Sequence, residues 1–123
     1  MPSPMPQAGP GFLDIALALS QIGDVDAMND MIVMLEESLA RDVPQVSALL
    51  QQGDVQGANR LLHGIKGFIP LFCPLTFCEE VVRVEAMSKS AESAQLTEAY
   101  GALRPHLDML LAEVAAYLRA NGL

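Results

Sequence analysis

The feature that most constrains the fold of this chain is a set of apolar residues that recur at three- and four-residue spacing. Residues at that spacing lie on one face of an α-helix, whereas a half-buried strand would alternate. The clearest example is the stripe of Met28, Met31, Ile32, Leu35, Leu39, Val46, Leu49 and Leu50. Leu and Ala together number 34, against 16 for Val, Ile and Thr, which also favours helix over sheet. We therefore expect an all-α fold.

The stripes and the capping residues between them predict five helices. The expected ranges are 12–22, about 24–52 with a bend at Pro44, 55 to about 72, about 74 to 87 or 89 with Leu75 buried, and about 94–120 with a bend at Pro105. The last four are substantial and their connections are short. An antiparallel four-helix bundle with a short additional N-terminal helix is therefore the expected architecture.

The length of 123 residues suits a single domain. Four of the eight prolines fall within the first ten residues, which cannot hold a helix. We expect residues 1–11 to be a flexible lead-in rich in Pro and Gly, and residues 12–123 to form the domain.

The net charge of −8 argues against binding to nucleic acid or to anionic membranes, because both carry negative charge. The longest mostly apolar run covers residues 67–78, far short of the roughly 20 residues that span a bilayer. No Lys or Arg precedes Arg41, so the chain lacks the basic start of a signal peptide. We expect a cytoplasmic protein.

Most of the reactive side chains are expected to be structural. Cys73 and Cys78 match no zinc or redox spacing, and we interpret them as core residues. The carboxylates, including the pairs at 36–37 and 79–80, are expected on solvated helix faces. The sequence contains no Walker loop, dinucleotide-binding glycine pattern or nucleophile elbow.

His63 is the exception, because it lies on the polar side of its helix, roughly 160° from the centre of the apolar stripe. Lys66 and Gly67 are three and four residues further on, so both neighbour the imidazole on the helix surface. Gly64 and Gly67 each cost the helix about 1 kcal/mol relative to alanine, and close approach of another macromolecule would explain bare backbone there. We expect the Lys66 stem to pack while its ammonium stays in solvent.

An exposed neutral imidazole is a competent nucleophile near pH 7. Phosphoryl transfer suits such a residue, since the reaction needs an in-line nucleophile and charge stabilisation, and a partner can supply the metal. A surface histidine with an accidental lysine and glycine beside it remains the alternative on these grounds.

The run A-N-R-L-L-H-G-I-K-G at residues 58–67 resembles the signature helix of histidine-containing phosphotransfer (Hpt) domains of bacterial phosphorelays, in which H-x-hydrophobic-K-G is the pattern. The turn at residues 49–54 and the Val84–Glu85 pair also resemble the family. The resemblance implies a carrier, not an enzyme, that takes a phosphoryl group from one receiver-domain aspartate and passes it to another. It makes His63 the phosphorylated residue, Lys66 an electrostatic helper and Gly67 the clearance for the docking receiver.

The same resemblance implies no cofactor or metal of its own, with Mg²⁺ held by the partner receiver. The partners would be response-regulator receiver domains or a hybrid sensor kinase, and we expect a monomer. The chain departs from the family pattern at Phe68, Ile69 and Pro70, and it has Cys73 where a family glycine is usual. Pro70 predicts that the helix kinks or tightens beyond His63.

Two other functions are compatible with the sequence. One is a helical protein-interaction bundle without phosphotransfer, for which the off-stripe Val33 and Met34 could form a docking surface unless the N-terminal segment covers them. The other is an enzyme that uses His63 with a carboxylate. No Asp or Glu lies three or four residues from His63, so in that case the carboxylate comes from another helix. His106 has no Lys-Gly pair beside it, so we expect His63 alone to accept a phosphoryl group.

Overall fold

The computed structural model describes residues 11–90 and 92–123, and within these ranges it contains helices and no strand. The elements are α1 (Ile15–Ile22), α2 (Val25–Gln51), α3 (Val55–Phe68), the 3₁₀ turn η2 (Ile69–Leu71), α4 (Leu75–Met87) and α5 (Ser93–Ala120). The expected all-α class is confirmed. The predicted lead-in, apart from Gly11, lies outside the described residues.

The first three helices have the same kind of N-cap. An aspartate precedes each one, and its carboxylate accepts a backbone N–H of the first turn: Asp14 from Leu17, Asp24 from Ala27 and Asp54 from Gly57. These bonds satisfy donors that have no partner within the helix. Gly23, with φ of 87°, ends α1 in the left-handed region that glycine adopts without strain.

Proline has different effects in different helices. α2 continues through Pro44 and α5 continues through Pro105. α3 ends at Phe68 instead of extending to about Phe72 as expected, because Pro70 has no N–H and, in a continued α-helix, its ring would clash with the Lys66 carbonyl. The chain tightens there into η2, so the predicted tightening beyond His63 is confirmed.

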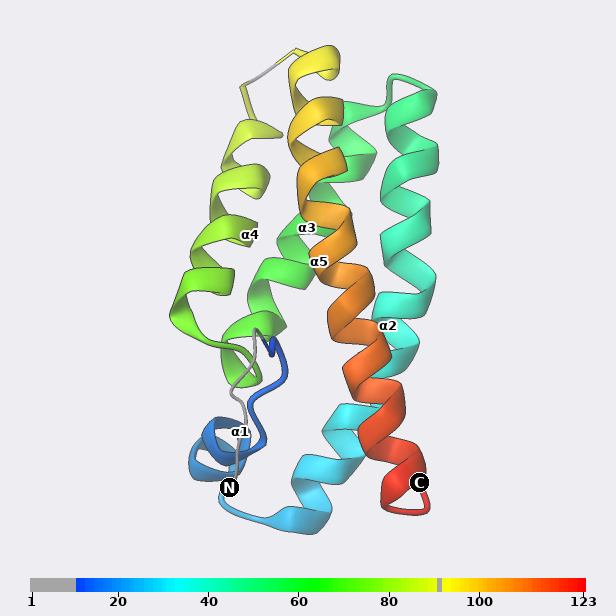
Figure 1. Cartoon of the computed structure of the whole chain (residues 1–123). Helices are drawn as coiled ribbons and strands as arrows, with labels where there is room; N and C mark the ends of the chain where they lie inside the picture. Colours follow the sequence, from blue (N-terminus) through cyan, green and yellow to red (C-terminus); the bar gives the residue numbers. More distant parts are fainter. Residues whose placement is uncertain (1–10, 91) are drawn as a thin grey trace, which may run out of the picture.

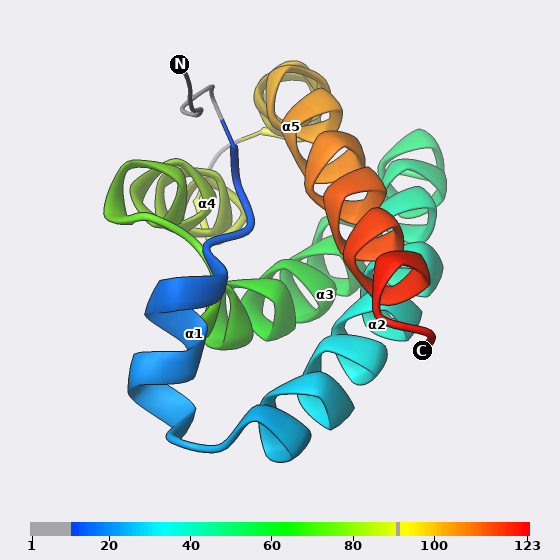
Figure 2. The same cartoon turned by 60° about the horizontal axis from the view of Figure 1, so that its bottom comes forward.

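The helices form a bundle in which α2 contacts α3 and α5, and α4 contacts the same two helices. Figure 1 shows these four elements side by side. α1 packs against α2 and η2 and lies across the end of the bundle at which α5 finishes (Figure 2).

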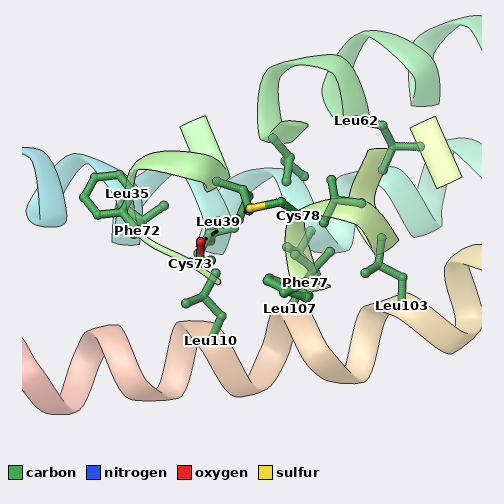
Figure 3. Packing of buried hydrophobic residues seen from close by; sticks show 14 of the residues in the cluster. Leu35, Leu39, Leu62, Phe72, Cys73, Phe77, Cys78, Leu103, Leu107 and Leu110 are labelled. Atoms are coloured by element: carbon green, nitrogen blue, oxygen red, sulfur yellow. Dashed lines mark hydrogen bonds between the residues drawn. The ribbon is translucent and has the colours of Figure 1, made fainter. Parts of the chain in front are cut away.

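The core runs between the helices, where Leu39, Leu62, Phe77, Leu107 and their neighbours pack together (Figure 3). Cys73 and Cys78 are buried free thiols in this core, as predicted. Burial raises the pKa of the Cys73 thiol, which therefore stays protonated and inert at neutral pH.

One expectation about burial is wrong. Leu75, the first residue of α4, is 72% exposed. Tyr100 of α5 is buried, and its hydroxyl donates to the Val43 carbonyl at 2.8 Å. A hydroxyl that finds a buried acceptor removes the cost of burying the phenol.

Residues 11–14, which precede α1, form a strap that contacts α4 and α5. The Phe12 and Leu13 N–H groups both donate to Glu113 Oε1, at 2.8 and 2.7 Å. The Phe12 ring packs against Phe77, with 4.8 Å between ring centroids. Figure 2 shows the strap running between α4 and α5.

Candidate functional site

His63 lies in the second half of α3 with 68% of its side chain exposed, as predicted. Gly64 and Gly67 flank it on the same exposed surface. A Cβ added at either glycine would meet no atom within 4 Å. The face of α3 around the imidazole is therefore bare backbone that another molecule can approach closely.

A buried carboxylate lies beneath this imidazole. Glu85 of α4 has only 2% of its side chain exposed, and its Oε2 is 3.6 Å from His63 Nδ1. This separation is within ion-pair range but too long for a hydrogen bond. The Nδ1 edge of the ring thus faces the carboxylate, and Nε2 makes no hydrogen bond with any residue that the structure describes.

Four polar side chains surround the carboxylate and form, with it, what we call the Glu85 network. Lys66 Nζ is 3.1 Å from Oε1, and Lys89 Nζ is 3.5 Å from Oε2. Asn59 Nδ2 donates to Oε2 at 3.2 Å and to the Ser88 hydroxyl oxygen at 2.6 Å. Both carboxylate oxygens therefore have partners, as a buried charge requires.

Opposing effects act on the acidity of Glu85. Burial alone would raise its pKa, but the hydrogen bond and charge of Lys66, with contributions from Asn59 and Lys89, bring the pKa below its ordinary value. Glu85 is therefore an anion at neutral pH. The exposed His63 ring therefore lies next to the Glu85 carboxylate, whose negative charge is balanced by Lys66 and Lys89.

Two sequence expectations are corrected here. Glu85 is not on a solvated face, and the Lys66 ammonium is not free in solvent but pairs with Glu85. The two residues are 19 positions apart on different helices, so no helical spacing could connect them. The Val84–Glu85 pair in the family resemblance was the one signal that pointed to this residue.

Charge is distributed unevenly over the molecule. α3 carries Arg60 and Lys66 and no acidic residue, and Lys89, which follows α4, pairs with the same carboxylate as Lys66. α2, by contrast, has five acidic residues (Asp26, Asp30, Glu36, Glu37 and Asp42) and one basic residue, Arg41. The surroundings of His63 are thus basic in a chain whose net charge is −8.

The second histidine has a different setting. His106 of α5 is 42% exposed, and its Nδ1 lies 2.9 and 3.0 Å from the two carboxylate oxygens of Glu80. Its ring is 5.5 Å from that of Phe12 in the strap. Glu80 was expected on a solvated face, but its carboxylate contacts His106 and so links α4 to α5. His106 has no bare glycine face and no lysine among these contacts.

Val33 and Met34, the residues of the alternative docking surface, differ in their exposure. Val33 is half-buried and packs against the core, whereas Met34 is 62% exposed.

None of the helices in the described part of the chain is long and apolar enough to cross a membrane. In comparisons with known proteins, no protein-family model, curated protein or solved structure matches this chain.

Proposed function

We propose that this protein is a cytoplasmic histidine phosphotransfer carrier, which accepts a phosphoryl group on His63 from a receiver-domain aspartate and passes it to another. The observation that carries the proposal is an exposed imidazole on a bare glycine face, with its Nδ1 edge toward a buried carboxylate. In this proposal α2 to α5 are the antiparallel four-helix bundle of such a carrier. The return of α5 onto α2 and the short connections between successive helices support that arrangement.

The transfer step uses the free nitrogen. In the tautomer with its proton on Nδ1, the Nε2 lone pair attacks the phosphorus of the receiver's aspartyl phosphate. A P–N bond forms, the P–O bond to the carboxylate breaks, and the aspartate leaves as an anion. Positive charge develops on the ring as this happens. Glu85 lies 3.6 Å from Nδ1, so a shift of a few tenths of an ångström lets it accept the Nδ1 hydrogen bond and stabilise that charge.

The neighbouring residues have separate roles. Lys66 keeps Glu85 ionised and places a cation beside the incoming phosphoryl oxygens. Gly67 leaves room for the acidic pocket of the receiver, which also holds the Mg²⁺ that the reaction needs. The basic surface of α3 is complementary to that pocket. No ATP-binding residues are involved, because the phosphoryl group arrives already activated.

Incubation with a phosphorylated receiver domain tests the proposal. We expect the label on this protein to be acid-labile and base-stable, as a phosphoramidate is. His63→Gln should abolish labelling while the helical circular dichroism stays unchanged, because the side chain is mostly in solvent. His106→Gln is the matched control and should leave labelling intact.

Labelling that survives His63→Gln and disappears in His106→Gln would show that the site is wrong. No transfer from any receiver to the folded protein would favour the second candidate, an interaction bundle without phosphotransfer. The exposed Met34 is the observation that supports that candidate.

A further inference from the structure

Asn59 and Ser88 belong to the Glu85 network, but the proposed function gives them no role. Asn59 precedes His63 by about one turn of α3, and Ser88 is the C-cap of α4. The Ser88 hydroxyl donates to the Glu85 carbonyl, so its oxygen is left to accept from the Asn59 amide at 2.6 Å. The same amide donates to Glu85 Oε2 at 3.2 Å. Three hydrogen bonds therefore connect the Glu85 side chain to its own main chain through two other residues.

This ring of hydrogen bonds determines the orientation of the Asn59 amide. Its neighbours are a carboxylate and a hydroxyl oxygen whose proton is already used, and both of them accept hydrogen bonds, so the NH₂ group faces them. The bond to the buried Ser88 is the short one, at 2.6 Å against 3.2 Å for the bond to Glu85. The amide is thus anchored at Ser88, and its bond to Glu85 is the one that can lengthen.

Asn59 and His63 compete for the same carboxylate oxygen. Around Glu85 Oε2 lie Asn59 Nδ2 at 3.2 Å, Lys89 Nζ at 3.5 Å and His63 Nδ1 at 3.6 Å. The other oxygen, Oε1, is held by Lys66 at 3.1 Å. Of the three contacts with Oε2, the one with Asn59 alone has an ordinary hydrogen-bond length. Asn59 therefore keeps Oε2 from closing on the imidazole.

The remaining charged groups near the imidazole are cations. Arg60 and Lys66 lie three residues to either side of His63 on α3, and Lys89 follows α4. Both α2 and α4 pack against α3, yet Glu85 is the one acidic residue of the described chain within ion-pair distance of His63. Glu85 is therefore the group that favours a protonated imidazole, and its other hydrogen bonds decide how strongly it does so.

We propose that Asn59, anchored by Ser88, is a positioning residue that holds Glu85 Oε2 beside His63 Nδ1 without letting the two close into an ion pair. The proposal rests on the proposed function, because it assigns Asn59 a role in that reaction. The arrangement favours a neutral ring with a free Nε2 lone pair until the phosphoryl group arrives. As positive charge develops on the ring, Oε2 exchanges the Asn59 hydrogen bond for the Nδ1 hydrogen bond, and Asn59 keeps its bond to Ser88.

Asn59→Leu tests this role, because leucine has a similar shape and no donor. Without the amide, Oε2 closes on Nδ1 and favours the imidazolium. In a ¹⁵N NMR titration of the unphosphorylated protein, His63 of the variant should gain its proton at a pH higher by about half a unit to one unit. Ser88→Ala, which removes the anchor, should give a smaller shift in the same direction. Asn29→Leu, at an asparagine of α2 that accepts from the Tyr117 hydroxyl, should leave the titration unchanged.

The pH profile of transfer separates positioning from folding. On the acid side of the profile, a phosphorylated receiver should transfer to Asn59→Leu about three- to tenfold more slowly than to the wild type, because a smaller fraction of the imidazole is neutral. The two rates should converge at alkaline pH, where both rings are neutral. A loss by the same factor at every pH, measured per folded molecule, would reduce Asn59 to a structural role and overturn the proposal.

The titration needs no receiver, so it distinguishes a failure of this proposal from a failure of the proposed function. An unshifted or lowered His63 titration in Asn59→Leu would overturn the positioning role even if transfer to the wild type is normal. A shifted titration in a protein that accepts no phosphoryl group would contradict the proposed function and leave the restraint on Glu85 standing.

Discussion

At the residue scale, the burial of Glu85 determines how its neighbours behave. Removing a carboxylate from water is costly, and here Lys66, Lys89 and Asn59 offset that cost. Truncating any one partner leaves part of the charge uncompensated. The residues around His63 therefore act as a unit, and a single substitution in the network changes both stability and the electrostatics of the imidazole.

Lys66→Ala illustrates this coupling. The variant should slow transfer by about one to two orders of magnitude, as expected for a lost charge contact of roughly 1.5 to 3 kcal/mol. It should also lower the free energy of unfolding by about 1 to 3 kcal/mol, because Glu85 loses its shortest ion pair. Denaturant unfolding and single-turnover transfer per folded molecule measure the two effects. Unchanged transfer kinetics would remove Lys66 from the site.

The acidity of Glu85 predicts a pH dependence of stability. Its pKa in the folded protein is lowered, so the native state binds fewer protons than the unfolded state as this group titrates. Its stabilisation is complete above the ordinary glutamate pKa of about 4.3 and is lost as the pH falls below it. The stability difference between wild type and Glu85→Gln should therefore shrink in acid. A difference that stays constant from pH 7 to pH 3 would contradict this assignment.

At the element scale, α3 combines a well-packed face with an unusually bare one. Ala58, Leu62 and Ile65 are fully buried, while two glycines interrupt the exposed side of the same helix. Glycine in a helix interior costs about 1 kcal/mol relative to alanine. In the proposed function the loss in stability is the consequence of keeping the docking face clear.

Gly67→Ala separates docking from folding. Because a Cβ there meets no atom, the variant should be more stable by up to about 1 kcal/mol, yet it should transfer more slowly. Gly67→Gln should slow transfer further. Gly101→Ala, at an equally open position inside α5, should give a similar gain in stability with normal transfer. A destabilised Gly67→Ala that transfers normally per folded molecule would contradict a docking role.

The helices show where sequence reasoning works and where it stops. The apolar stripes predict the order of the helices and the exposure of His63 and Gly67, because helical periodicity is a local property. The same is true of the tightening at Pro70. The Glu85 network could not be found in this way, since it joins Asn59 and Lys66 of α3 to a residue of α4. Its formation depends on how two helices pack, which no local spacing encodes.

At the scale of the whole molecule, the strap ties the start of the domain to its last helix. Glu113 is about 100 positions from its two donors, Phe12 and Leu13, and it accepts both N–H groups on one oxygen. Phe12 then covers Phe77 at the seam between α4 and α5. The attachment of the strap to α5 therefore depends on the Glu113 carboxylate.

Glu113→Ala should lower the free energy of unfolding by on the order of 2 kcal/mol, because two partly buried backbone donors lose their acceptor. Glu113→Gln, which keeps an acceptor oxygen, should recover part of that loss. Hydrogen exchange at Phe12 and Leu13 should accelerate in Glu113→Ala, while exchange in the middle of α3 changes less. Unchanged protection of both amides would show that the strap is held by other contacts.

The most direct test of the account is to identify the nitrogen that carries phosphorus after transfer from a receiver. The chain contains two histidines, so NMR spectra of the phosphorylated protein with ¹⁵N-labelled imidazoles can be assigned with the two single His→Gln variants. We predict phosphorus on Nε2 of His63, with Nδ1 still protonated and facing Glu85. Phosphorus on Nδ1 of His63, on His106 or on no histidine would contradict it.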